Sequence, residues 1–422
     1  MSFDFTVERN SSKWVLGADG YLKEYIADAP AIEFNADGSY KGVLVEPQSV
    51  NEAKASEDLD NATYWLTART TIAGNTETDP KGGTNSFLLS ETAISNNFYF
   101  ITESAHRPSV ASGETWTSSI FVKKGDGANA PDIIQLTHLP GTFGASQYAN
   151  FDISVGGGTS GTVTASSGGT AGIRYYGNGW YRISWTATST GAGDGSFILV
   201  FTNDNPTATR IPTYAGQTDA NVFVWGAQLE ESPIATSYIP TTTGAVTRVK
   251  DDIYLTSASS LIGQTEGTLF IEVDWQLTSG ASQHLLHISD GTNANRFLIY
   301  NLSSPVQLRM LAVANSVALT NQGEASTAYS GIQKIALAYK TDDFELYRNG
   351  SSISTDTSGS LASLATLTDV DFGQSVFATS QANMWIRAVA LFTTRLSDAE
   401  AYSLTGYDTY AQMANALQYT IL

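Results

Sequence analysis

The chain has 422 residues, with 22 basic and 41 acidic side chains, a formal net charge of −19 and no cysteine. This length is too great for one ordinary core and indicates two to three domains of about 150 residues each. The negative charge disfavours nucleic acid and anionic membrane surfaces as partners, and the lack of cysteine excludes disulfides, zinc ribbons and thiol catalysis.

Composition and hydropathy favour a β-rich protein folded inside a cell. Only 15% of the residues are charged, and Ser, Thr, Gly and aromatic residues are abundant, a mixture that favours β-sandwiches with long polar loops. No apolar run approaches the roughly 18 residues of a membrane span. The first ten residues lack the basic and apolar regions of a signal peptide. We therefore expect no membrane insertion and no export by the ordinary secretory route.

The first segment comprises residues 1–45. It carries Trp14 and turn signals at residues 19–20 and 37–38, but too little apolar material for a core of its own. We expect an N-terminal arm that docks on the next domain or on a neighbouring chain.

Residues 46–250 contain short β-type runs separated by Gly, Ser, Asn and Asp clusters, and they predict a first β-sandwich. Apolar and polar residues alternate over 181–187, which is the period of a half-buried strand. A last strand passes through residues 222–225, Gly226 interrupts it, and Pro240 forces an extended exit from the domain. We expect the domain boundary near residues 244–254.

Residues 251–422 show clearer alternation and predict a second β-sandwich. Asn349 with Gly350 supplies the positive-φ pair of a type I′ hairpin turn between strands. Ser397 with Glu400, and Thr409 with Gln412, have the spacing of helix capping boxes. Strands are predicted at residues 269–277, 331–340, 343–348, 370–373 and 384–392. The predicted fold class is therefore all-β, with two β-sandwich (jelly-roll) domains, an N-terminal arm and short C-terminal helices.

Several phrases resemble a known group of proteins. GVLVEP at 42–47, SEDLDNATYW at 56–65, GNGWYRISW at 177–185 and WGAQLE at 225–230 are similar to a carbohydrate-binding-type β-sandwich of bacteriophage virion proteins. Residues 251–422 resemble a concanavalin A-like or laminin G-like jelly roll, with LSDAE at 396–400 in its usual closing helix. The resemblance implies a tail-fibre or head-fibre type protein of the virion, assembled in the host cytoplasm.

The second sandwich contains an incomplete glycosidase pattern. Concanavalin A-like glycosidases carry an ExDxxE pattern on one strand, and this chain has Glu272 and Asp274 but Leu277 in the last position. Without the second carboxylic acid no group on that strand donates a proton to the leaving sugar oxygen. No GxSxG elbow or Ser/His/Asp order appears. We expect Glu272 and Asp274 to lie on an exposed polar face of a protein that is not an enzyme.

Metal and phosphate sites are also disfavoured by spacing. His284 and His287 are three apart on a predicted strand and point to opposite faces, which does not match a zinc site. The acidic pairs at 251–252 and 342–343 lack the ligand spacing of calcium sites, so we expect them in solvated turns. The glycine clusters do not open a helix after a strand, as phosphate loops do. We therefore expect no metal ion and no cofactor.

Aromatic residues next to polar ones remain as candidates for sugar recognition, which combines stacking on rings with hydrogen bonds to hydroxyls. Each of these rings is equally compatible with a place in the core. The candidate carbohydrate-binding residues are Tyr64, Trp65, Arg174, Tyr175, Tyr176, Asn178 and Trp180.

The function favoured by the sequence is non-catalytic adhesion of a phage virion to bacterial surface polysaccharide, by a homo-oligomer, expected to be a trimer, that also contacts other virion proteins. Two alternatives stay open: a purely structural virion decoration or connector, and a polysaccharide depolymerase with carboxylates from separate strands. An exposed aromatic cluster in a groove favours glycan binding, and a flat patch between subunits favours assembly. Two carboxyl groups about 5 to 10 Å apart in a cleft favour an enzyme.

Overall fold

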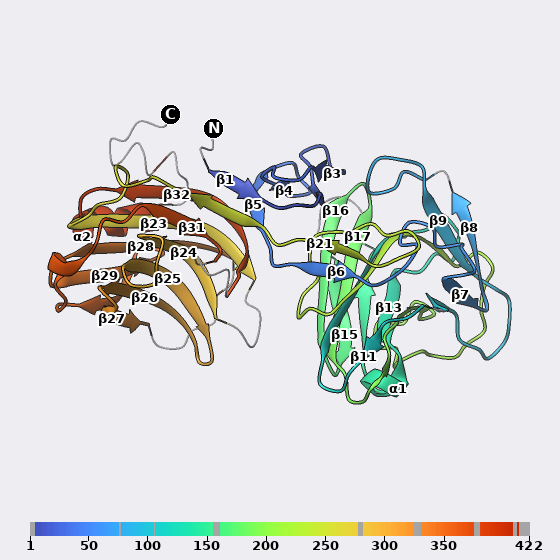
Figure 1. The fold of residues 1–422 in the computed structure, drawn as a ribbon. Helices are drawn as coiled ribbons and strands as arrows, with labels where there is room; N and C mark the ends of the chain where they lie inside the picture. Colours follow the sequence, from blue (N-terminus) through green and yellow to red (C-terminus); the bar gives the residue numbers. More distant parts are fainter. Residues whose placement is uncertain are drawn as a thin grey trace.

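The computed structural model describes residues 5–75, 77–104, 106–154, 161–276, 282–324, 329, 331–374, 380–407 and 412. It confirms the all-β fold class, with two β-sandwiches and short helices (Figure 1). The two sandwiches lie side by side, and the N-terminal strands lie between them.

The first sandwich consists of two six-stranded sheets. In order, one contains β15 (Thr162–Ser167), β14 (Tyr148–Asp152), β13 (Ile133–His138), β19 (Phe197–Phe201), β10 (Phe100–Glu103) and β7 (Trp65–Ala68). The other contains β16 (Thr170–Gly177), β17 (Trp180–Thr188), β12 (Thr115–Lys124), β20 (Asn221–Glu230), β9 (Ser86–Glu91) and β8 (Thr70–Asn75). The short pair β11 (Ser109–Val110) and β18 (Gly193–Asp194), and helix α1 (Pro140–Phe143), lie in the connections.

The geometry of strand β20 requires the glycine in the segment WGAQLE. Every residue of β20 is buried, and its pairing with β12 shifts register between Ser119 and Phe121. Gly226 has a φ of 64°, and a Cβ at this position would lie 3.0 Å from the Phe121 ring. A residue without a side chain therefore allows the strand to bulge against an aromatic core.

The second sandwich consists of two seven-stranded sheets. One contains β1 (Thr6–Glu8), β22 (Asp252–Leu255), β31 (Asp369–Phe372), β24 (Gln283–Ser289), β25 (Arg296–Ser303), β26 (Val306–Ala314) and β27 (Val317–Gly323). The other contains β30 (Ser351–Asp356), β29 (Asp343–Arg348), β28 (Ile332–Lys340), β23 (Glu266–Gln276), β32 (Asn383–Phe392), β5 (Tyr40–Val45) and β4 (Ile32–Phe34).

The N-terminal region supplies strands to this second sandwich. Strand β1 pairs with β22, and β5 pairs with β32, far away in the sequence. Val7, Val43 and Val45 pack in the same core as the strands of residues 251–392. The hairpin of β2 (Lys13–Leu16) and β3 (Leu22–Tyr25) lies beside them. The limits at 45/46 and 250/251 stay predictions. Strands β1 and β5 pair with the second sandwich, whereas Leu16 and Leu22 of the β2–β3 hairpin pack against the first.

The first sandwich is connected to the second through a two-stranded stem, β6 (Ser49–Asn51) paired with β21 (Val246–Arg248) (Figure 1). Buried ion pairs hold the base of this stem. Asp251 pairs with Lys13 at 2.5 Å and with Arg9 at 2.8 Å, and Glu46 pairs with Lys13 at 3.0 Å and with Arg248 at 3.6 Å. The prediction of a solvated turn at Asp251 is wrong, because this carboxylate is 0% exposed and neutralises two buried cations.

Local signals in the second sandwich agree with the predicted elements. Asn349 and Gly350 have φ values of 47° and 74° between β29 and β30, as a type I′ turn requires. Helix α2 (Asp398–Gly406) begins with the predicted capping box of Ser397 and Glu400. A 3-10 turn, η1 (Leu361–Ser363), precedes β31. The second predicted helix, capped at Thr409, lies outside the described residues.

Candidate functional site

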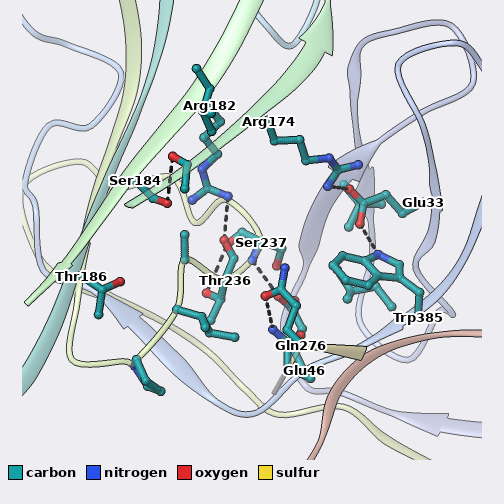
Figure 2. A pocket seen from close by; sticks show the side chains of 18 of the residues that line it. Glu33, Glu46, Arg174, Arg182, Ser184, Thr186, Thr236, Ser237, Gln276 and Trp385 are labelled. Carbon is teal, nitrogen blue, oxygen red and sulfur yellow. Dashed lines mark hydrogen bonds and ion pairs between the residues drawn. The ribbon is translucent and has the colours of Figure 1, made fainter. Parts of the chain in front are cut away.

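A cavity of about 380 Å³ lies where the two sandwiches meet (Figure 2). Strands β16 and β17 and the segment 233–237 form its first wall. The N-terminal strands, with Gln276 and residues 383 and 385 at the ends of β23 and β32, form the opposite wall. The cavity is therefore made of chain segments that only the complete fold brings together.

Strand β17 presents a polar row to the cavity because its residues alternate. Tyr181, Ile183, Trp185 and Ala187 point into the core, and Arg182, Ser184 and Thr186 lie on the opposite face. The Arg182 guanidinium donates to the Thr236 carbonyl at 2.7 Å and to the Ser119 hydroxyl at 2.9 Å. Arg182 is only 6% exposed, so these bonds fix it rigidly in the wall.

Glu33 connects the two walls. Arg174 of β16 donates to one carboxylate oxygen of Glu33 at 2.5 Å, and the Trp385 indole N–H donates to the other at 2.5 Å (Figure 2). Trp385 lies on the outer face of β32 and packs in a small apolar cluster with Val15 and Leu44. Burial opposes the charge of Arg174, but the nearby Glu33 carboxylate raises the pKa of this guanidinium overall.

Lys41 covers the Trp385 ring, with its Nζ 3.4 Å from the ring centroid. Burial lowers the pKa of Lys41 to about 8, and the positive charge of Arg174 adds to this effect. The ammonium group thus takes part in a cation–π contact at the edge of the cavity wall.

Glu46 lies at the base of the stem and also lines the cavity. Its Oε1 accepts a hydrogen bond from the Ser237 backbone N–H at 2.8 Å, and its Oε2 forms the ion pairs with Lys13 and Arg248. Burial alone would raise the pKa of Glu46, but Arg248, Lys13 and Ser237 hold it at about 2. Glu46 is therefore ionised near neutral pH and balanced by two cations.

Some polar atoms of the lining residues have no hydrogen-bond partner in the described part of the protein. These buried atoms are Trp14 Nε1, Glu46 Oε2, Arg182 Nε, Ser237 Oγ and Asn383 Oδ1. Buried polar groups are nearly always hydrogen-bonded, so groups without such a bond on both walls of one cavity are available to bind a polar molecule.

Two of the predicted sugar-stacking residues belong to the core. Trp65 is 5% exposed and donates from its indole N–H to the Ala55 carbonyl, and Trp180 is 1% exposed and donates to the Thr78 carbonyl. Both rings are covered by neighbours, because a buried indole gains from packing once its N–H has an acceptor. The prediction of these two residues as stacking platforms is corrected by their burial.

The remaining candidates fall into separate places. Arg174 and Tyr176 line the cavity, with the guanidinium carbon 4.8 Å from the tyrosine ring centroid. Tyr175 points to the core side and accepts from the Gly179 N–H, and the exposed Asn178 donates to the Gly20 carbonyl. Tyr64 packs at the edge of the first core, beside the other sheet. The structure therefore brings only Arg174 and Tyr176 to the cavity.

Sequence reasoning missed most of the lining. It placed residues 182, 184 and 186 on the wet face of a strand, which is the one signal that the sequence offers. Glu33 and Trp385 stand 352 positions apart, and no pattern connects them.

Other titratable groups outside the cavity are engaged in structural contacts. Glu272 accepts from Arg387 at 2.8 Å and is 9% exposed, so it does not lie on an open polar face. His287 Nδ1 lies 3.0 Å from Asp371, and His138 Nε2 lies 3.0 Å from the buried Ser118 hydroxyl. Among the described residues, no group of three or more His, Asp or Glu side chains is arranged to hold a metal ion. No helix in the described ranges is long and apolar enough to cross a membrane.

No protein-family model and no curated protein matches the sequence. Solved structures resemble parts of the chain, and they include carbohydrate-binding and lectin-like β-sandwiches. The CBM40 module of the Ruminococcus gnavus IT-sialidase is 19% identical, covers 36% of this chain and 88% of its own, and has a TM-score of 0.31. A structure of botulinum neurotoxin type C is 15% identical over 40% of this chain and 41% of its own, with a TM-score of 0.31. Chicken galectin 2 is 10% identical, covers 33% and 96% of the two chains, and has a TM-score of 0.24. The likeness is partial and assigns no ligand to this chain.

Proposed function

We propose that the protein binds glycans without cleaving them, and that the cavity between the sandwiches holds the sugar. The observation that supports this most is the composition of the cavity wall. Hydroxyl, amide, guanidinium and aliphatic side chains together line the cavity of about 380 Å³. Ligand pockets measure about 300 to 1,000 Å³, so the cavity has room for a mono- or disaccharide unit.

The chemistry of the lining matches a saccharide. Ser184, Thr186 and Gln276 offer groups that both donate and accept hydrogen bonds, as sugar hydroxyls require. Ile173 and Ile234 offer apolar surface for the C–H faces of a pyranose ring. A purely apolar pocket would reject the hydroxyls, and a purely charged one would leave the ring faces without contacts.

We propose that the protein does not cleave the sugar because both carboxylates of the cavity lining already have partners. Glu33 is bonded to Arg174 and Trp385, and Glu46 to Ser237 and two cations of the stem. A general acid must carry a proton that it can transfer to the leaving oxygen. Carboxylates held in ion pairs by basic partners do not meet that requirement.

The biological setting in the proposal is a bacteriophage virion that adheres to bacterial surface polysaccharide. The phrases GVLVEP, GNGWYRISW and WGAQLE support this setting through their resemblance to phage virion proteins. A trimer bound to other virion proteins would present several cavities at once, so that millimolar single-site affinity becomes useful avidity.

The test is an array of bacterial polysaccharides probed with the full chain and with two variants. Thr186→Trp fills the cavity, and Thr162→Trp places the same ring on an exposed position of β15 outside it. We expect binding by the wild type and by Thr162→Trp, and loss of at least tenfold in affinity for Thr186→Trp at an unchanged melting temperature.

The outcomes separate the alternatives. Equal binding by both variants would place the site elsewhere, and no binding to any glycan would favour a structural virion role. Reducing ends that accumulate with time during incubation would identify a depolymerase.

A further inference from the structure

The charges around the cavity point to an acidic ligand: we infer that the saccharide bound there carries a carboxylate, as uronic and sialic acids do. This inference rests on the proposed function and specifies its ligand class. It follows from which charged groups of the wall already have a partner and which do not.

The carboxylates of the lining are neutralised. In a chain of net charge −19, the cavity is lined by two glutamates and two arginines. Glu33 pairs with Arg174 at 2.5 Å, and Glu46 pairs with Lys13 and with Arg248. An incoming anion therefore meets no free carboxylate from these two residues.

Arg182 is the lining cation that lacks such a partner. Its two bonds go to a neutral carbonyl and a neutral hydroxyl, on Thr236 and Ser119, and within the described residues no carboxylate forms an ion pair with it. Glu230 accepts hydrogen bonds from Ser49 and from the backbone and side chain of Thr236, and among the residues that the structure describes it forms no ion pair with Arg182. A buried guanidinium without a counter-charge is costly, and a ligand carboxylate would offset that cost.

Lys41 is a second cation without an ion-pair partner in the described ranges, and its contact is the Trp385 ring. Lys41 does not line the cavity itself, but the Trp385 ring that it covers does, on the wall opposite Arg182. Arg182 and Lys41 are thus cations without an ion pair in the described part of the chain, on either side of the cavity, although the Asp274 carboxylate also acts on Lys41. They offer positive charge to an anionic ligand inside an acidic protein.

The test uses four acidic polysaccharides, namely alginate, polygalacturonate, hyaluronan and polysialic acid, each in its native form and after reduction of its carboxyl groups to alcohols. Neutral polysaccharides are measured beside them, with the full-length protein. We expect binding to at least one native polymer and at least a tenfold loss of affinity for its reduced form.

Variants locate the effect. Ser184→Asp adds a negative charge beside Arg182, and Ser184→Asn adds the same volume without charge. We expect the first to lose acidic-polymer binding and the second to keep it. Arg182→Gln should act like Ser184→Asp, while Arg210→Gln is its control, because Arg210 also bonds a carbonyl and a hydroxyl but lies outside the cavity. If Arg182→Gln fails to fold, the Ser184 pair alone decides.

Three results would overturn the inference. The first is binding to neutral polymers but to none of the four acidic ones, which would leave the glycan-binding function intact. The second is equal affinity for native and reduced polymers. The third is equal binding by Ser184→Asp and Ser184→Asn. Failure to bind any glycan, acidic or neutral, would reject the proposed function together with the inference.

Discussion

The two sandwiches are alike in architecture but differ in how the chain builds them. All strands of the two six-stranded sheets come from residues 65–230, one continuous stretch. The two seven-stranded sheets combine β1, β4 and β5 with strands that begin at β22. The first sandwich is thus inserted into the second, and the cavity lies where insert and host meet. A ligand in the cavity would therefore contact both the insert and the host.

The largest expected effect comes from separating insert and host. The sequence alone predicts that residues 251–422 fold by themselves, but strand pairing predicts that they do not, because β32 loses β5 and the core loses Val43 and Val45. A chain in which an Asn-Gly turn replaces residues 52–245 should fold, since Asn51 and Val246 are paired at the end of the stem. Circular dichroism and proton NMR would show which of the two chains is folded.

If residues 251–422 alone are as stable as the version that keeps residues 1–51, the N-terminal strands are dispensable and the description as an insertion fails. The isolated insert, residues 49–248, serves as the positive control for a continuous sandwich.

The junction itself is tested by Glu46→Gln. The folded-state pKa of Glu46 is about 2, below the ordinary 4.5, so its contribution to stability is complete above pH 4.5 and is lost as the pH falls toward 2. The variant should lose about 3 kcal/mol at pH 7. Urea unfolding at several pH values should show wild type and variant converging toward pH 2. Glu24→Gln, an exposed position in β3, should change little, and a pH-independent gap for Glu46→Gln would contradict the ion-pair explanation.

A smaller effect is expected within the insert for Gly226→Ala. Its φ of 64° and the 3.0 Å approach to Phe121 predict a loss of about 1 to 3 kcal/mol. Gly74→Ala in β8 is the matched control, because a Cβ there meets no atom within 4 Å. Calorimetry should show the loss in the unfolding of the insert and not in that of the host; equal melting of the two variants would argue against a strained bulge.

The smallest effect is expected in the host for Ser397→Ala. This change removes the hydroxyl that caps α2 and should cost about 1 kcal/mol. Ser397→Asp should restore most of the loss, because aspartate also caps helices. Thermal melts of the three proteins are sufficient, and no rescue by aspartate would show that the serine acts in another way.

Sequence periodicity predicted the parts of the fold that depend on neighbouring residues. Strand β23, the turn at Asn349 and the capping box at Ser397 each carry their signal within a few positions. Strands β1 and β4 are three residues long, too short for a period to show. The partners that join β1 and β5 to the second sandwich, β22 and β32, follow hundreds of residues later. For this reason the sequence predicted an N-terminal arm and not strands of the second sandwich.

The site was harder to predict for the same reason. Trp65 and Trp180 were selected by residue type, which does not distinguish a ring that stacks on a ligand from one that fills a core. Arg182 was visible only as a polar position in a strand. Its role depends on which carboxylates lie near it, and Glu33 and Glu46 reach the cavity from the other sandwich through tertiary structure.

The insertion also sets the order in which a ribosome allows the protein to fold. Strand β5 ends at residue 45, and its partner β32 begins at residue 383. At about 5 to 20 residues per second, on the order of 20 to 70 s of synthesis separate the two. During that time the insert can complete both of its sheets. Strand β5 pairs only with β4, so its other edge is open to incorrect pairing. Strand β5, one of the first strands made, is therefore among the last to gain its second partner.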